Sequence, residues 1–279
     1  MHRLGAVSFL NAKPLIDGLD QRSDVELLLD VPSKLAALLE AGEVDAALVP
    51  IVDVIRSAGR YEVVSDACIG CDGETMTVRI FSQVPPDRIT RLRADTDSHT
   101  SVALARVIFA QLYDRELIIE PLDARRESLD ESEAVLLIGD KVVDTGRTGF
   151  AYEMDLGGAW RAHTGLPFIF AAWARRSDEA SGSVARPDSL ARLLSAARDR
   201  GVANASRIAE SMGPPLGWTV EYARRYLTRC LTFTIDARSV EGANLFAQHC
   251  ASLGLAKSSE IKWPEQLCPA TAGLPTTGN

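Results

Sequence analysis

The sequence predicts an α/β protein of two lobes that enclose a ligand-binding cleft. Short apolar runs alternate with helical patterns through most of the chain, which is typical of parallel sheets covered by helices. Two longer apolar runs, at residues 75–82 and 166–174, bracket a second unit of the same style. A chain that leaves one α/β unit, builds another and returns forms a double-strand hinge, and therefore a two-lobed clamp.

The first lobe is predicted from residues 1–82 together with residues 170–265. Its opening stretch, LGAVSFLNAKPL at residues 4–15, is an apolar strand that ends in a polar turn and leads into a helix. Ligands of open α/β sheets bind at such strand ends, beside the N-termini of the following helices, so this stretch is one expected wall of the cleft. Further strands are expected at 25–29, 45–49 and 75–82, and helices at 32–39, 50–58, 188–212, 219–228 and 237–253.

The second lobe is predicted from residues 83–169, after a break at Pro85 and Pro86. An amphipathic helix is expected at 101–113, and residues 152–163 are expected to be helical at least in part. The segment 266–279 is rich in Pro, Thr and Gly without periodicity, which predicts a disordered tail. Strands of this lobe are expected at 91–94, 117–120 and 134–138, and the returning strand at 166–174.

Composition limits the classes of partner. A length of 279 residues suits two domains of ordinary size. The net charge of −8, without Lys and Arg clustered among aromatics, argues against nucleic acid or an anionic membrane as the partner. A small anionic ligand remains compatible, because helix N-termini and backbone amides supply local positive potential. Neither a run of about 18 apolar residues nor a signal-peptide pattern is present, so a cytoplasmic protein is expected, in an oligomeric state that the sequence leaves open.

The cysteines and histidines give no pattern of a metal or redox site. Cys68 and Cys71 form a CxxC, which is compatible with redox chemistry or half of a zinc site, but Cys230 and Cys250 lie too far apart to complete one. Burial of the cysteines as small apolar residues is the favoured interpretation. The four histidines lack metal-ligand spacing, and nucleotide-binding and hydrolase motifs are missing, so neither a metal nor a cofactor is predicted.

Polar residues follow the predicted strands at four places. The first place holds Ser8 and Asn11, and the second is the DGETMT stretch that ends at Thr77. At both places the polar residues are also compatible with ordinary turn chemistry. The third place is DTDSHTS at residues 95–101, which leads directly into an apolar helix.

The third stretch is the most informative, because a helix N-terminus favours a carboxylate or a phosphate. Ser98, Thr100 and Ser101 offer hydroxyls there, although capping alone would need one of them. At the fourth place Asp140 closes a buried strand and Asp155 follows in the chain, and each is compatible with a helix cap or a general base. These residues together predict a clamp for a small anion, without deciding between binding and catalysis.

Five stretches together resemble the menaquinone-biosynthesis family of the futalosine route. Within this family the turn FLNAKP is similar to that of the chorismate dehydratases, whereas the sister enzymes that make dihydroxynaphthoate open with a CPND-type turn. The family commonly has Arg where this chain has His99, and the CIGCDGETMT segment departs from its pattern. The five stretches, in order within residues 4–255, are VSFLNAKPL, LVPIVDVI, DTDSHTSVALARV, LLIGDKVV and DLGGAWRAHTGLPFIFAAWA.

The resemblance implies a fold like that of type II periplasmic binding proteins, in agreement with the predicted clamp. It also implies a cytoplasmic carbon–oxygen lyase without metal or cofactor, which converts chorismate to 3-[(1-carboxyvinyl)oxy]benzoate and water. The alternatives are the sister dihydroxynaphthoate synthase and a non-catalytic protein that binds a small anion.

Site residues follow from the same resemblance. Asn11 and Asp140 are expected to be catalytic, with either Asp140 or a carboxylate of the substrate as the proton acceptor. The residues expected to hold the substrate are Thr77, Ser98, Thr100, Ser101 and Asp155, together with Ser8 from the first polar stretch.

Overall fold

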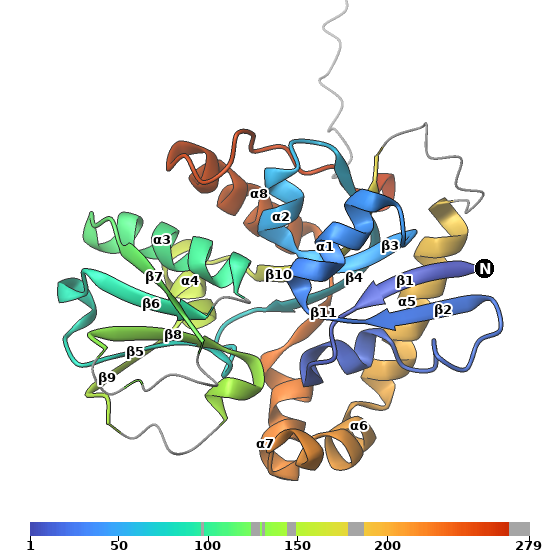
Figure 1. Cartoon of the computed structure of the whole chain (residues 1–279), viewed down its shortest axis with the longest axis horizontal. Helices are drawn as coiled ribbons and strands as arrows, with labels where there is room; N and C mark the ends of the chain where they lie inside the picture. The colour runs from blue at the N-terminus through green and yellow to red at the C-terminus, as the bar shows by residue number, and fades with distance from the viewer. Residues whose placement is uncertain (96–97, 124–128, 130–131, 144–148, 178–186, 268–279) are drawn as a thin grey trace, which may run out of the picture.

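The protein has two lobes, each built on one mixed β-sheet, in a computed structural model that describes residues 1–95, 98–123, 129, 132–143, 149–177 and 187–267 (Figure 1). The α/β, two-lobed architecture predicted from the sequence is therefore confirmed. We call the lobe with the six-stranded sheet lobe I and the lobe with the five-stranded sheet lobe II. The segment predicted to be a disordered tail lies, from residue 268 onward, outside the described residues.

In lobe I the strand order is β11-β4-β10-β3-β1-β2. The strands β1, β2 and β3 are parallel, while β10 runs antiparallel to both β3 and β4. The strands are β1 (His2–Ala6), β2 (Val25–Leu29), β3 (Ala46–Pro50), β4 (Tyr61–Cys71), β10 (Phe168–Arg176) and β11 (Thr232–Thr234). The α-helices are α1 (Pro32–Ala41), α2 (Ile51–Arg56), α5 (Pro187–Ala203), α6 (Ala205–Met212), α7 (Val220–Arg225) and α8 (Ala237–Ser252).

In lobe II the strand order is β7-β6-β8-β5-β9, with α3 (His99–Tyr113) and α4 (Leu156–Thr164) packed beside the sheet (Figure 1). The central strand β8 is buried on both faces. Its residues Ala134 and Leu136 belong to the main core, and Val135 and Leu137 to a small second cluster. The strands are β5 (Val78–Ser82), β6 (Arg91–Asp95), β7 (Ile118–Leu122), β8 (Ala134–Ile138) and β9 (Tyr152–Asp155).

The chain crosses between the lobes twice, and the two crossings lie side by side. Cys71, the last residue of β4, pairs with Phe168, the first residue of β10. The start of α4 packs on the first crossing so closely that a Cβ on Gly157 would lie 2.3 Å from Cγ2 of Thr75. Glycine is therefore required at this position by close approach.

Several elements differ from the sequence prediction. The strand expected at 75–82 in the first lobe is β5 (Val78–Ser82), which belongs to the sheet of lobe II. The longest strand, β4, was not predicted, because Ser65 and Asp66 interrupt its apolar pattern. Both side chains form hydrogen bonds with Ser195 of α5. Residues 152–155 form the edge strand β9 rather than the start of a helix, and the helix begins at Leu156. An edge strand with exposed residues has no apolar alternation to reveal it.

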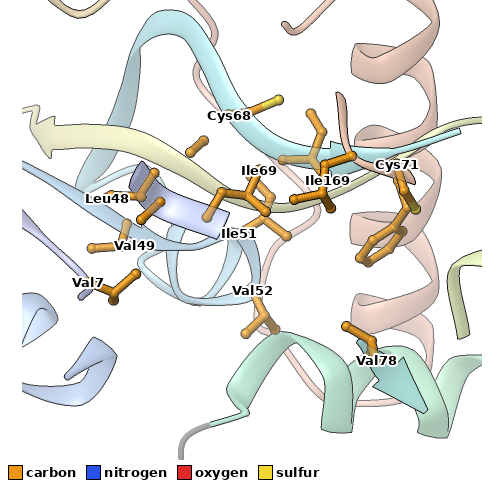
Figure 2. Packing of buried hydrophobic residues seen from close by; sticks show 14 of the residues in the cluster. Val7, Leu48, Val49, Ile51, Val52, Cys68, Ile69, Cys71, Val78 and Ile169 are labelled. Atoms are coloured by element: carbon orange, nitrogen blue, oxygen red, sulfur yellow. The ribbon is translucent and has the colours of Figure 1, made fainter. Parts of the chain in front are cut away.

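One main hydrophobic core extends through both lobes, and Figure 2 shows part of it around Leu48, Ile69 and Val78. Among the described residues, no helix combines the length and apolar character needed to cross a membrane. That part of the chain also holds no group of three His, Cys, Asp or Glu side chains placed to bind a metal.

The cysteines within the described ranges are unpaired thiols. Cys68, Cys71 and Cys250 are buried, as the interpretation of small apolar residues requires, while Cys230 is half-buried. Burial raises the pKa of Cys71 and of Cys250 to about 12, and it also raises the pKa of Cys68. Cys268 lies outside the described residues.

Candidate active site

A cavity of about 90 Å³ lies between the two lobes, where the strand ends of lobe I face the first turn of α3. This is smaller than the roughly 300 to 1,000 Å³ typical of small-molecule sites. Its polar lining consists of Asn11, Ser98, His99, Thr100 and Ser101. Its apolar lining consists of Val7, Phe9, Leu48, Pro50, Ile69, Ile138, Phe170 and Ala171, of which Val7, Leu48 and Ile69 are labelled in Figure 2.

Asn11 presents a buried carbonyl oxygen at the cavity. It lies in a 3-10 helix, Leu10–Leu15, directly after the turn that follows β1. Its side chain donates to the hydroxyl of Tyr226, while its Oδ1 is buried without a hydrogen-bond partner in the described structure. A buried, unsatisfied acceptor costs about 1 to 3 kcal/mol, which a ligand donor would recover.

Ser98 is the N-cap residue of α3, but its hydroxyl does not cap the helix. The Oγ is buried and, like Oδ1 of Asn11, has no partner within the described residues. Two orphaned polar atoms therefore line the cavity at the N-terminus of a 15-residue helix, where free amides and the helix dipole favour an anion.

Thr100 has a different role from its neighbours. Its hydroxyl donates to the carbonyl of Phe170 on β10 at 3.1 Å and accepts from the amide of Val52 at 3.4 Å. Figure 2 shows Val52 above the first turn of α3. Thr100 thus ties that turn to lobe I, whereas Ser101 is a buried hydroxyl of the cavity lining.

His99 and Asp53 form a pair that the sequence analysis did not predict. Nδ1 of His99, in α3, lies 2.9 Å from Oδ2 and 3.2 Å from Oδ1 of Asp53, in α2. The pair therefore spans the two lobes beside the cavity. The signal for His99 was its place in the DTDSHTS stretch, but the partner lies 46 residues earlier and no local pattern indicates it.

Thr77 and Asp140 are not among the residues that line the cavity. The hydroxyl of Thr77 donates to the hydroxyl of Tyr226 at 2.8 Å, and Nε1 of Trp218 donates to Oδ1 of Asp140 at 2.8 Å. Trp218 and Tyr226 stack, with ring centroids 4.9 Å apart. These contacts join lobe II to the segment after α6, which the sequence analysis left without a functional role.

Tyr226 connects this network to Asn11. It begins a π-helical segment, Tyr226–Cys230, a geometry often found at functional sites. Burial raises the pKa of Tyr226 well above its ordinary value, and donation from Thr77 and Asn11 opposes this only in part. The phenol therefore stays protonated near neutral pH.

Two further predicted site residues, Ser8 and Asp155, lie outside the cavity lining. Ser8 is exposed. The Asp155 carboxylate caps α4 by accepting from the amide of Gly158 at 3.0 Å, and it also accepts from the amides of Thr75 and Met76. The structure therefore brings Asn11, Ser98, Thr100 and Ser101 together and does not bring Ser8 or Asp155 to them.

Comparison with protein families decides the relationship of this chain. A family model described as menaquinone biosynthesis matches residues 2–252. The chain belongs to this menaquinone-biosynthesis family. This chain is similar to the chorismate dehydratase of Thermus thermophilus. The two are 28% identical over 234 residues, and the match covers 77% of this chain and 82% of the relative.

Solved structures confirm the fold of this menaquinone-biosynthesis protein as that of periplasmic binding proteins. The alkanesulfonate-binding protein SsuA from Xanthomonas axonopodis has a TM-score of 0.68 at 12% identity and covers 93% of this chain and 95% of its own. The aliphatic sulphonate binding protein SsuA of Escherichia coli has a TM-score of 0.64 at 15% identity. The match covers 100% of this chain and 97% of that protein. A protein from Archaeoglobus fulgidus has a TM-score of 0.71 at 16% identity. The match covers 91% of this chain and 98% of that protein.

Proposed function

We propose that this protein is a chorismate dehydratase, which converts chorismate to 3-[(1-carboxyvinyl)oxy]benzoate and water in the futalosine route of menaquinone biosynthesis. The observation that carries the proposal is the unsatisfied carbonyl of Asn11 at an interlobe cavity, in a chain similar to a chorismate dehydratase. A biosynthetic enzyme of this kind fits the cytoplasmic location expected from the sequence.

The chemistry of chorismate favours the elimination of water. The C3 hydrogen of chorismate is acidic through the conjugated ring carboxylate, and the C4 hydroxyl leaves as the ring becomes aromatic. The departing hydrogen and hydroxyl are cis, so a stepwise elimination through a stabilised carbanion is favoured over a concerted anti elimination. The step is redox-neutral: the C3–H and C4–O bonds break, and the hydrogen and hydroxyl leave as water.

In this mechanism the protein orients the substrate and stabilises the spread negative charge. Oδ1 of Asn11 accepts a hydrogen bond from the substrate and positions the reacting carbons. The first turn of α3, with Ser98 and Ser101, receives a substrate carboxylate. Because Asp140 is engaged by Trp218 outside the cavity lining, its position favours a carboxylate of the substrate as the proton acceptor.

The cavity lies at the junction of the two lobes, so both contribute to binding the substrate. The two crossings between the lobes pair at Cys71 and Phe168 and hold the lobes beside each other there.

The test is to incubate purified protein with chorismate and to follow the product by mass spectrometry. The expected product has lost one water and shows the absorbance of an aromatic enolpyruvyl ether. Chorismate that binds but stays unchanged would overturn the enzyme assignment in favour of a binding protein, the alternative that the SsuA-like fold suggests. If chorismate neither binds nor reacts, the sister dihydroxynaphthoate synthase becomes the favoured function, and its substrate would then be tested.

A further inference from the structure

The interlobe cavity holds a single ionisable side chain within its described lining, and that side chain is His99. The other lining residues are apolar or carry a neutral amide or hydroxyl. A ligand with two carboxylates would therefore meet one titratable group here, in a chain whose net charge is −8. Burying a carboxylate without a cationic partner costs several kcal/mol, so the charge state of this ring matters for binding.

Asp53 fixes the orientation of the His99 ring. A carboxylate only accepts hydrogen bonds. Nδ1 of His99 therefore carries a hydrogen and donates a hydrogen bond to Oδ2 of Asp53 at 2.9 Å. The Asp53 side chain is 14% exposed and lies 3.8 Å from Nη1 of Arg56 on the same helix. Asp53 is also the counter-charge of the ring when His99 is an imidazolium.

The pair lies beside the point where the two lobes are already fastened together. Thr100, the next residue after His99, donates to the carbonyl of Phe170 in lobe I. The position of the ring relative to Asn11 is thus set from both lobes. A cation held in this way lies next to the amides of the α3 N-terminus, and both favour the same ligand charge.

We propose that His99, as an imidazolium oriented by Asp53, binds one carboxylate of the substrate. The proposal rests on the chorismate dehydratase function proposed above and adds the residue that recognises the substrate's charge. His99 is the substrate-binding residue, and Asp53 is a positioning residue that acts through it. The charged groups facing His99 within the described structure are Asp53 and Arg56 of α2; the other elements around the cavity contribute no ionisable lining residue there.

The experiment compares steady-state kinetics and equilibrium binding of wild type and variants. His99→Gln removes the charge and is expected to raise KM for chorismate about 10- to 100-fold, the loss for a charged hydrogen bond, with a smaller change in kcat. His99→Arg keeps a permanent cation and is expected to restore KM to within about fivefold of wild type. His163→Gln, at an exposed histidine of α4, is the matched control and should behave as wild type.

The pH profile separates a charge role from a structural one. In wild type, KM should be lower in mildly acidic than in mildly alkaline buffer, because imidazole is charged only in the former, whereas in His99→Arg it should be the same in both. Asp53→Asn should move the rise in KM to lower pH, because the imidazolium loses its counter-charge. A structural role for Asp53 would lower stability without moving this profile.

Two results would overturn the proposal. Loss of kcat in His99→Arg as large as in His99→Gln would make His99 a proton acceptor rather than a carboxylate-binding cation. Unchanged KM in His99→Gln would remove His99 from substrate recognition.

Direct calorimetric binding of 3-[(1-carboxyvinyl)oxy]benzoate separates this proposal from the proposed function. If wild type does not turn over chorismate, the dehydratase function fails. Weaker binding of this dicarboxylate to His99→Gln than to wild type would still support the role of His99, and equal binding or none at all would overturn it.

Discussion

Asp155, the last residue of β9, accepts three hydrogen bonds from Thr75 on the first crossing between the lobes. Both carboxylate oxygens accept from the amide of Thr75, at 2.9 and 3.0 Å, and Oδ2 accepts from its hydroxyl at 3.1 Å. The same carboxylate caps α4 through Gly158. One side chain therefore joins the first crossing to the helix that leads to the second.

Replacing Asp155 by Ala should lower the free energy of unfolding by about 3 kcal/mol, the value expected for losing a helix cap and several hydrogen bonds to a largely buried carboxylate. The measurement is chemical denaturation followed by circular dichroism. Glu153→Ala is the matched control, because Glu153 lies on the same strand and also pairs with Arg79 but is 45% exposed. It should cost less than about 1 kcal/mol. Equal losses in the two variants would contradict the role given to Asp155.

The elements with strong local patterns could be predicted from the sequence. The strand at 134–138 is a continuous apolar run bounded by Gly139, and the helix at 32–41 has Pro at its start and Gly42 in a left-handed conformation at its end. The longest strand, β4, could not be found in this way. Its polar residues are satisfied by α5, more than 120 residues later, so only the folded chain explains them.

The candidate site was predictable where it is local and not where it depends on pairing. Asn11 and the hydroxyls at residues 98–101 follow strands, and their positions indicated the cavity. Tyr226 and Asp53 contact the site from distant elements, and each lies in an apolar, helical pattern without a functional signal. Asp155 was detected as a carboxylate at a junction, but sequence alone does not distinguish a cap from a ligand.

Asn11→Ala should leave the fold nearly intact while removing most of the activity. The variant loses the hydrogen bond to Tyr226 but also removes the unsatisfied buried carbonyl, so the free energy of unfolding should change by less than about 1 kcal/mol. If Oδ1 positions the reacting carbons, kcat for chorismate should fall about 10²- to 10³-fold, as for the loss of a preorganised polar group. Full activity in a folded Asn11→Ala protein would remove Asn11 from the mechanism.

Tyr226→Phe tests whether the buried network positions Asn11. The variant loses the hydroxyl that accepts hydrogen bonds from Thr77 and Asn11, but it keeps the ring that stacks on Trp218. Loss of one hydrogen bond of about 1.4 kcal/mol corresponds to about a tenfold fall in kcat, with KM changing less. Tyr222→Phe is the control, because Tyr222 packs on the same tryptophan at 5.8 Å between ring centroids. A similar fall in both variants would indicate general loosening of this segment instead.

The buried thiols predict a specific dependence of stability on pH. The pKa of Cys71 and of Cys250 is raised by burial from 9.0 to about 12, so each stays neutral in the folded protein where it would ionise in the unfolded chain. Their contribution to stability is fully present below pH 9 and is lost as the pH rises from 9 toward 12. The free energy of unfolding should fall by up to about 1.4 kcal/mol per pH unit for each thiol in this window.

The thiols of Cys68, Cys71 and Cys250 should also resist Ellman's reagent at pH 8, because the reactive thiolate is suppressed and the sulfur is buried. In a Cys268→Ser protein, we expect only the half-buried Cys230 to react before denaturant is added. Cys250→Ala should make the decline of stability above pH 9 less steep. An unchanged slope, or rapid native labelling of the three buried thiols, would show that this core opens more readily than its packing indicates.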